Sequence, residues 1–399
     1  MKIGILTFHS QLNYGGVLQC WALQTALEKL GHEVVVIDRW LDSDNSWLEK
    51  GYDKYSLLQW IKFCIRSTLG LGNISQLLRV RRTKRFLTEH LRLTPYHFVD
   101  WNDAPKELGV DMLVVGSDQV WHCGDWGNPR VYLLDGAPDS PAISYAASFG
   151  FTELPKYLSE CEAVSLAEPF YKKGFKKFKA ISCRESEGVS LCRKLGAEAQ
   201  HVLDPTLLVN KADWKCLIRS AAKHCTKRVV CYFLGVDYTS ILQRLLRFSA
   251  ENDCEVELFV DQWVFDALPM PTSLAKLRQW VKGIRRKLFS NVRVYDSAGP
   301  IEFVKSIASA DLVISDSFHA LMFSIIFGRN VRILAPKSDH RKKMFARIEE
   351  FASEMTGQIV VDSLETALKS FADDAVATID SAWLESRRSE SFNFLRRNI

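Results

Sequence analysis

The chain has 399 residues, of which 47% are hydrophobic and 25% are charged, and its formal net charge is +5. These proportions are typical of a globular protein, and the length has room for about two domains. A small positive charge permits attraction to anionic ligands but does not indicate nucleic acid, and the chain lacks RNA-binding aromatic patterns and zinc-finger spacings. No apolar run reaches the length of about 18 residues that predicts a membrane-spanning helix.

The ten cysteines are scattered along the chain without a Cys-x-x-Cys pair or a zinc-like cluster. The chain opens on a predicted strand and not on an export signal. We therefore expect reduced thiols, no resident metal and a cytoplasmic protein.

The first part of the chain predicts a β-α-β unit over residues 3–38. A strand at 3–8 precedes a helix whose apolar residues recur at helical spacing as far as Gly31, and a valine-rich strand follows at 33–38. Units of this kind build parallel sheets with right-handed crossovers.

Residues 41–100 are rich in aromatic and basic side chains, as in 57–66 and 79–85. We expect a helical insertion or flap on the first domain. Its mixture of basic and apolar residues suits peripheral contact with the inner face of a membrane. A helix buried on one side and solvated on the other is the alternative.

Strands resume after residue 110, and the pattern restarts near residue 208. Predicted strands lie at 111–115, 142–146, 179–182, 229–234, 255–260, 291–295, 312–314 and 331–334. The fold class predicted is α/β, with two doubly wound Rossmann-like domains at 1–207 and 208–370 and a C-terminal helix in 371–399 that crosses back onto the first domain. Two such domains would face a cleft and bind a ligand at the carboxyl ends of their strands.

The loop after the first strand holds His9, Asn13, Tyr14, Gly15 and Gly16. Adjacent glycines at a strand-to-helix turn let backbone N–H groups approach a substrate closely. A tight turn that needs glycine is the alternative, and the dinucleotide pattern G-x-G-x-x-G is absent.

Asp118, Gln119 and Trp121 follow the strand at 111–115. A carboxylate, an amide and a flat apolar face suit a sugar, whose hydroxyls need hydrogen bonds and whose C–H face packs on aromatic rings. The alternative is a capped helix start with a tryptophan in the core.

Arg184 follows the strand at 179–182 and precedes a predicted helix. A guanidinium at this edge of a sheet is suited to grip a carboxylate or phosphate in a fork. A surface pair with Glu185 is the alternative, and such pairs contribute little.

Residues 311–328 combine a buried strand, a polar turn and an apolar helix stopped by Gly328. The turn lies at a helix N-terminus, where open N–H groups and the helix dipole favour an anion. His319 falls in the first turn of this helix, beside Asp316 and Ser317, and a proton donor there suits a reaction in which phosphate leaves. Simple capping by Ser317 or Asp316, with a structural histidine, is the alternative.

With these segments the chain resembles the polysaccharide pyruvyl transferase family. The matching segments are Gly4–His9, Asn13–Gln19, Val115–Trp121, Ile143–Ser148, Ser182–Glu185, Asp204–Thr206 and Ser315–His319. The resemblance implies a fold like that of the GT-B glycosyltransferases. It also implies transfer of a carboxyethylidene group from phosphoenolpyruvate to two hydroxyls of one sugar, which gives a cyclic ketal.

The resemblance further implies that Arg184 and the turn at Ser317 and Phe318 bind the donor and that His319 is the acid. Many family members have Arg-Leu-His-Gly at this turn, where the present chain has Ser317-Phe-His-Ala320. A second donor-binding arginine is therefore missing at position 317. The candidate replacements follow the last predicted strand: Arg341, Lys342 and Lys343.

These roles combine into a mechanistic hypothesis. His319 protonates the methylene carbon of the donor, and Asp316 orients the imidazole or raises its pKa. Arg184, the N–H groups around Ser317, and the loop with Gly15 and Gly16 bind the donor. The acceptor side is assigned to Asn13, Tyr14, Asp118, Gln119 and Trp121. The scheme requires no metal or organic cofactor.

The expected acceptor is a galactose-like hexose of a surface polysaccharide or of its lipid-linked precursor. The alternative functions are a GT-B-type glycosyltransferase that uses a nucleotide sugar, and a non-catalytic subunit of polysaccharide assembly. The acceptor sugar and the position of the ketal stay open at this point.

Overall fold

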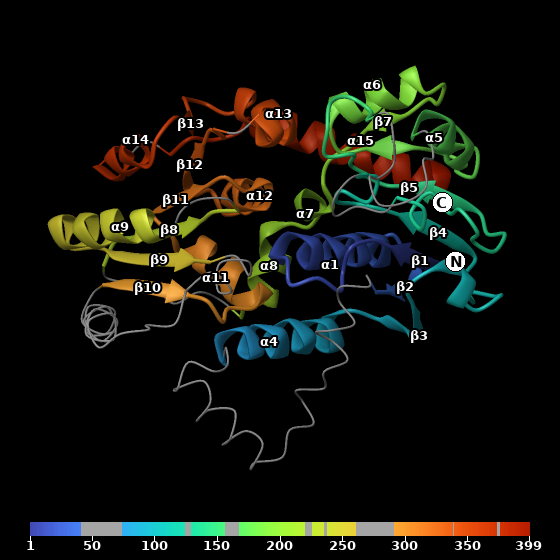
Figure 1. The fold of residues 1–399 in the computed structure, drawn as a ribbon, viewed down its shortest axis with the longest axis horizontal. Helices are drawn as coiled ribbons and strands as arrows, with labels where there is room; N and C mark the ends of the chain where they lie inside the picture. Colours follow the sequence, from blue (N-terminus) through green and yellow to red (C-terminus); the bar gives the residue numbers. More distant parts are fainter. Residues whose placement is uncertain are drawn as a thin grey trace, which may run out of the picture.

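A computed structural model describes the chain over most of its length. The described residues are 1–40, 74–123, 129–155, 167–219, 226–234, 238–260, 291–337, 339–372 and 376–399. The first part of the predicted helical insertion, 41–73, lies outside them. Figure 1 shows two α/β halves side by side, each built on its own sheet.

The sheet of the first domain has five parallel strands in the order β3-β2-β1-β4-β5. They are β1 (Lys2–Leu6), β2 (Glu33–Arg39), β3 (Leu93–Phe98), β4 (Met112–Val115) and β5 (Ala142–Ser144). A short parallel pair, β6 (Ser182–Cys183) and β7 (Gln200–His201), continues beyond β5 through isolated bridges. Helices cover both faces of a parallel sheet, which is why the central strands are apolar throughout.

The sheet of the second domain has six strands in the order β10-β9-β8-β11-β12-β13, all paired in parallel. They are β8 (Arg228–Tyr232), β9 (Glu255–Phe259), β10 (Val292–Tyr295), β11 (Leu312–Ser315), β12 (Asn330–Leu334) and β13 (Val360–Val361). The prediction of two Rossmann-like α/β domains is confirmed.

Helices separate the strands in both domains. They are α1 (Tyr14–Lys29), α4 (Ile74–His90), α5 (Ala167–Phe175), α6 (Ser186–Lys194), α7 (Pro205–Leu208), α8 (Lys211–Leu217), α9 (Tyr238–Asn252), α11 (Pro300–Ser309), α12 (Phe318–Phe327), α13 (Asp339–Ser353), α14 (Leu364–Lys369) and α15 (Ser381–Asn398), with 3-10 turns η2 (Trp101–Asp103) and η4 (Ser370–Ala372). Among the helices of the described residues, none combines the length and the apolar character needed to cross a bilayer.

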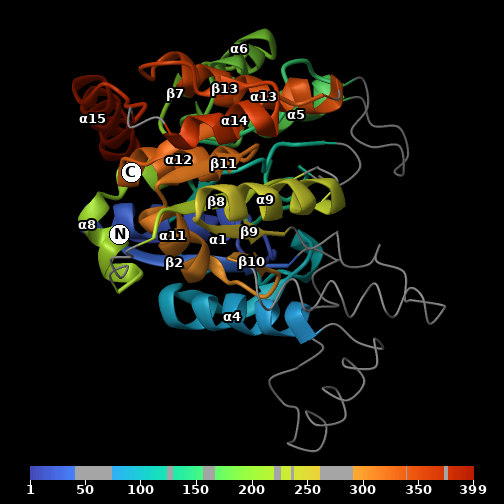
Figure 2. The same ribbon diagram turned by 90° about the vertical axis from the view of Figure 1, so that its left-hand side faces the viewer.

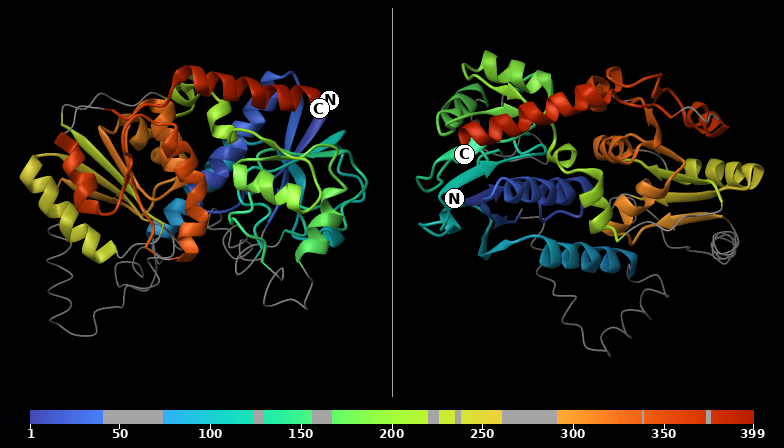
Figure 3. Two further views of the ribbon diagram at one scale, coloured as in Figure 1. Left: turned by 90° about the horizontal axis from the view of Figure 1, so that it is seen from above. Right: turned by 180° about the vertical axis from the view of Figure 1, so that it is seen from behind.

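The C-terminal helix α15 returns to the first domain, as predicted (Figure 3). Its Ser391 Oγ accepts a hydrogen bond from the backbone N–H of Leu203 at 3.0 Å. Arg388 Nε donates to the carbonyl of Leu207 at 2.6 Å. The helix therefore ties the end of the chain to the segment that leads from β7 into α7.

Residues 93–98, which we expected inside a helical insertion, instead form the edge strand β3. Pro95 is compatible with this place because an edge strand has one face of its backbone unpaired. The helix before it, α4, contacts both domains and lies next to α11 (Figure 2). Buried Arg79 donates from one guanidinium nitrogen to Val260 of the second domain and from the other to Leu12 of the first, at 2.9 Å each.

The two domains share a continuous apolar core beneath α1. Tyr14, at the start of α1, is 1% exposed and stacks on Phe303 of α11 at 4.7 Å between ring centroids. Its hydroxyl donates to the carbonyl of Ala298 at 3.2 Å. This packing holds the carboxyl end of β1 against the second domain and sets the spacing across the site.

All seven cysteines in the described part of the chain are free thiols. The closest pair is Cys183 and Cys192, whose sulfur atoms are 3.6 Å apart.

Candidate active site

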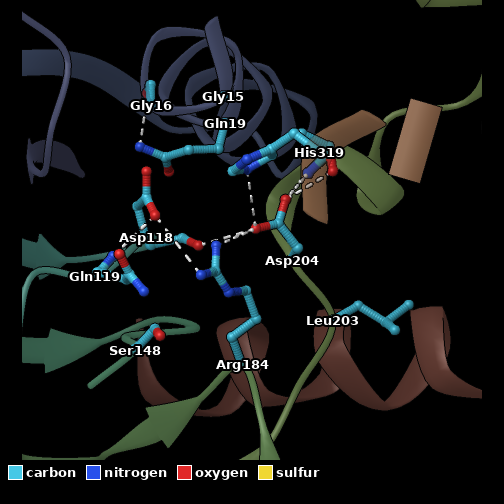
Figure 4. Close-up of polar contacts among 12 residues, drawn as sticks. Gly15, Gly16, Gln19, Asp118, Gln119, Ser148, Arg184, Leu203, Asp204 and His319 are labelled. Atoms are coloured by element: carbon cyan, nitrogen blue, oxygen red, sulfur yellow. Dashed lines mark hydrogen bonds and ion pairs between the residues drawn. The ribbon is translucent and has the colours of Figure 1, made fainter. Parts of the chain in front are cut away.

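Charged side chains from three loops of the first domain meet the N-terminus of α12 from the second domain. Asp118 follows β4, Arg184 follows β6 and Asp204 follows β7, while His319 lies in the first turn of α12. Figure 4 shows the four side chains pointing toward one another. The structure thus brings together three residues that the sequence singled out and one, Asp204, that it did not.

Arg184 is 1% exposed and is surrounded by carboxylates. Its nearest carboxylate oxygens belong to Asp204 at 3.1 Å, Asp118 at 3.6 Å and Glu185 at 3.7 Å. Burial alone would lower the pKa of Arg184, but the three carboxylates outweigh it and raise the pKa above its ordinary value. The pairing with Glu185 is therefore buried, which excludes the alternative of a solvated surface pair.

Asp204 is fully buried and accepts four hydrogen bonds. Oδ1 accepts from the N–H of Thr206 at 2.9 Å and from its hydroxyl at 2.6 Å, as the N-cap of α7. Oδ2 accepts from Arg184 at 3.1 Å and from Ser117 Oγ at 3.2 Å. Burial would raise the pKa of Asp204, but the charges of His319 and Arg184 and the bonds from Thr206 leave it lowered. The carboxylate stays ionised.

Asp204 carried a signal in the sequence. It belongs to the segment Asp204–Thr206 that supports the family resemblance, and an aspartate before a proline at a helix start is a typical cap. Because capping explains such a residue completely, the sequence did not mark it as part of a site.

The imidazole of His319 lies against this carboxylate. Nε2 is 3.8 Å from Asp204 Oδ2, and it is buried without a hydrogen-bond partner among the described residues. Burial is the largest influence and lowers the pKa of His319, while Asp204 and Asp118 oppose it and Arg184 reinforces it. An additional negative charge beside the ring would raise this pKa and favour protonation of the imidazole.

Asp316, which we expected to orient His319, has a different contact. Its Oδ1 accepts a hydrogen bond from the backbone N–H of Leu234, after β8, at 2.7 Å. The carboxylate that faces His319 is Asp204. Although Asp316 is only three residues from His319 in the sequence, its carboxylate bonds to the segment that follows the neighbouring strand β8.

The two glycines at the start of α1 differ in what surrounds them. A Cβ added at Gly15 would overlap Nδ1 of His319, whereas at Gly16 the nearest atoms would be 3.5 Å away. Their N–H groups both donate to Asn13 Oδ1, at 2.8 and 3.3 Å, so they cap the helix and do not form the predicted substrate cradle. Gly15 instead makes room for the imidazole.

The residues predicted to bind the acceptor fall into two groups: some lie beside the charged cluster and others are packed in the core. Asp118 and Gln119 adjoin the cluster, and the Asp118 side chain retains 14% exposure. Trp121 is fully buried, with its ring against Phe149 and Phe175, so the alternative of a core tryptophan is correct. Tyr14 packs between the domains, so neither ring presents a face to a sugar. Aromatic residues beside glycine-rich turns look alike in sequence whether they pack inward or outward.

Two guanidinium groups lie over the aromatic ring of Phe318, and the sequence did not predict the second of them. The Cζ atom of Arg184 lies 4.6 Å from the ring centroid, and that of Arg347, from α13, lies 5.6 Å away. Of the replacements predicted for position 317, Lys342 is exposed, and the side chains of Arg341 and Lys343 lie outside the described residues.

Nothing in the described residues forms a group of three metal-binding side chains around a common point. The ionisable groups that meet at the site are carboxylates, guanidiniums and an imidazole. Such a set can bind an anion and move a proton.

Comparisons with solved structures found distant similarity over nearly the whole chain. A putative UDP-N-acetylglucosamine 2-epimerase from Listeria monocytogenes is 13% identical, with 98% of this chain and 91% of that chain covered and a TM-score of 0.48. The UDP-GlcNAc 2-epimerase from Methanocaldococcus jannaschii is 12% identical, with 94% and 92% covered and a TM-score of 0.46. Spinosyn forosaminyltransferase is 12% identical, with 100% and 95% covered and a TM-score of 0.42.

No curated protein matches the chain. A family model described as polysaccharide pyruvyl transferase matches residues 13–338, a span that includes the glycine turn and every member of the charged cluster up to His319. The chain therefore belongs to the polysaccharide pyruvyl transferase family.

Proposed function

We propose that this protein transfers a carboxyethylidene group from phosphoenolpyruvate to two hydroxyls of a galactose-like hexose in a surface polysaccharide or its lipid-linked precursor. Family membership supports pyruvyl transfer to a polysaccharide. The observation that carries the proposal is the unpartnered Nε2 of buried His319, beside the carboxylate of Asp204 and next to Arg184.

In the proposed reaction, protonated His319 gives its proton to the methylene carbon of the donor. The adjacent carbon becomes oxocarbenium-like, and a sugar hydroxyl oxygen adds to it. That hydroxyl's proton returns to the imidazole. The carbon–oxygen bond to phosphate then breaks, a neighbouring hydroxyl closes the ketal, and the second hydroxyl proton leaves with the phosphate.

The surrounding charges suit these steps. Asp204 and Asp118 favour the protonated imidazole and oppose the effect of burial. Arg184 keeps two guanidinium nitrogens, Nε and Nη2, without hydrogen-bond partners, so it retains donors for the carboxylate or phosphate of the donor. We propose that the reaction needs neither a metal nor an organic cofactor, and turnover in the presence of a chelator tests this.

The test of the acid is the variant His319→Ala, with phosphate release measured in the presence of phosphoenolpyruvate and a panel of sugars. We expect turnover to fall by about 10²–10⁴-fold, the usual contribution of a general acid. The control is His32→Ala, because His32 precedes β2 at the opposite end of the sheet. Near-normal turnover in His319→Ala would remove this residue from the chemistry.

A second measurement separates pyruvyl transfer from the alternative functions. Phosphoenolpyruvate is expected to raise the thermal unfolding midpoint, because a ligand stabilises the state that binds it. Stabilisation by a nucleotide sugar alone would favour a glycosyltransferase. Sugar binding without phosphate release from any acceptor would favour a non-catalytic subunit.

A further inference from the structure

The N-terminus of α12, beside the charged cluster, has no side-chain cap. Ser317 occupies the N-cap position, but its side chain makes no capping hydrogen bond. The first N–H groups of a helix have no partners within it, so this end keeps donors for an anion. His319, 8% exposed and with an unpartnered Nε2, lies in the same turn.

Arg347 reaches this helix end from α13. Its guanidinium lies over the ring of Phe318, the first residue of α12. Its positive charge acts on both Arg184 and His319, which places it within the same electrostatic cluster. Phe351, one turn further along α13, contacts Phe318 at 5.9 Å between ring centroids.

A contact between the domains holds α13 in this position. Glu350 accepts hydrogen bonds from the backbone N–H and the hydroxyl of Ser186 at 3.3 Å each. Ser186 begins α6, immediately after Arg184 and Glu185. Arg347 and Glu350 are three residues apart, so they share a face of α13 that is directed at the first domain.

Arg347 differs from Arg184 because no carboxylate lies within ion-pair distance of it in the described residues. Within the described parts of the chain it forms no ion pair, and its Nε is buried without a hydrogen-bond partner. Burial of the guanidinium and the charge of Arg184 lower the pKa of Arg347 to about 10, although the more distant carboxylates of the cluster act in the opposite direction. Partial burial of a cation without an ion pair is costly, and a bound anion would offset that cost.

The donor needs such a cation. Three carboxylates already face Arg184, so that guanidinium cannot by itself neutralise a highly charged anion. We propose that Arg347 and the uncapped N-terminus of α12 form an anion subsite for phosphoenolpyruvate, in which Arg347 supplies the cation that position 317 lacks. This inference rests on the proposed function.

The test is calorimetric titration of the full-length protein with phosphoenolpyruvate, using Arg347→Gln, Arg347→Lys and the control Arg244→Gln. Arg244 belongs to the same domain but is exposed and paired with Glu365. We expect Arg347→Gln to weaken donor binding by about 10- to 100-fold, the range for a hydrogen bond to a charged group. Arg347→Lys should recover part of the affinity, and Arg244→Gln should bind like the wild type.

Separate titrations with inorganic phosphate and with pyruvate identify the group that Arg347 contacts. Loss of phosphate affinity in Arg347→Gln assigns it to the phosphoryl group, and loss of pyruvate affinity assigns it to the carboxylate. Unchanged phosphoenolpyruvate affinity in a folded Arg347→Gln or Arg347→Lys overturns this inference and leaves the proposed function standing. A wild-type protein that does not bind phosphoenolpyruvate overturns both.

Discussion

Two arginines from different domains approach the ring of Phe318, and their surroundings are opposite. Arg184, from the first domain, is enclosed by three carboxylates that raise its pKa. Arg347, from the second domain, has no ion pair among the described residues, and its pKa is lowered to about 10. The comparison shows that ion pairs with carboxylates offset much of the charge of buried Arg184, whereas half-buried Arg347, without an ion pair, keeps more of its charge for a ligand.

The largest expected difference between the two is in stability. Arg184→Met leaves three carboxylates without their buried partner, and we expect a loss of about 3–5 kcal/mol in the free energy of unfolding. Arg347→Met removes a cation that has no such partner, so its free energy of unfolding should stay within about 1 kcal/mol of wild type. Urea unfolding at neutral pH measures both. Equal losses in the two variants would mean that the carboxylates around Arg184 do not depend on it for their stability.

The glycines at the start of α1 test how closely the imidazole must be placed. Gly15→Ala pushes a methyl group into His319, and a displacement of about 1 Å from the catalytic position typically costs about 10²-fold in turnover. Gly16→Ala is the matched control, because its added methyl would meet only ordinary van der Waals contacts. Phosphate release measures the effect. If both variants kept full activity, His319 would not need its present position.

A smaller effect is expected on the pH dependence of donor binding. The pKa of His319 is lowered in the free protein, and the negative donor should raise it, so binding takes up a proton. Donor affinity should therefore weaken as pH rises between the two pKa values, by at most about tenfold per pH unit. Calorimetry across pH 5–8 follows this change.

The control for that measurement is His319→Gln. In this variant the pH dependence that comes from the imidazole should disappear, and only the part that comes from titration of the donor's phosphate should remain. Arg347 lowers the pKa of His319, so Arg347→Gln should raise that pKa. The decrease in donor affinity should then occur at higher pH. An unaltered pH profile in His319→Gln would show that another group takes up the proton.

Periodicity in the sequence predicted the long central strands and the helices between them, because parallel sheets need near-continuous apolar runs. Periodicity did not predict the short strands β7 and β13 or the strand β3 at the edge of the first sheet. The strand at 93–98 contains a proline and pairs on one side only, and β7 and β13 have two residues each, which is too short for a periodic signal. The helix α15 was predicted, and its return to the first domain was confirmed.

For the site, the sequence by itself determined that Asp118, Arg184 and His319 follow strands and so gather at the carboxyl edges of two sheets. Tertiary structure alone decided which charges touch: it placed Asp204 beside His319, buried Trp121 and Tyr14, and brought Arg347 across from another helix. The physical reason is that strand order places loops at an edge, whereas the contacts between side chains depend on how two domains pack against each other.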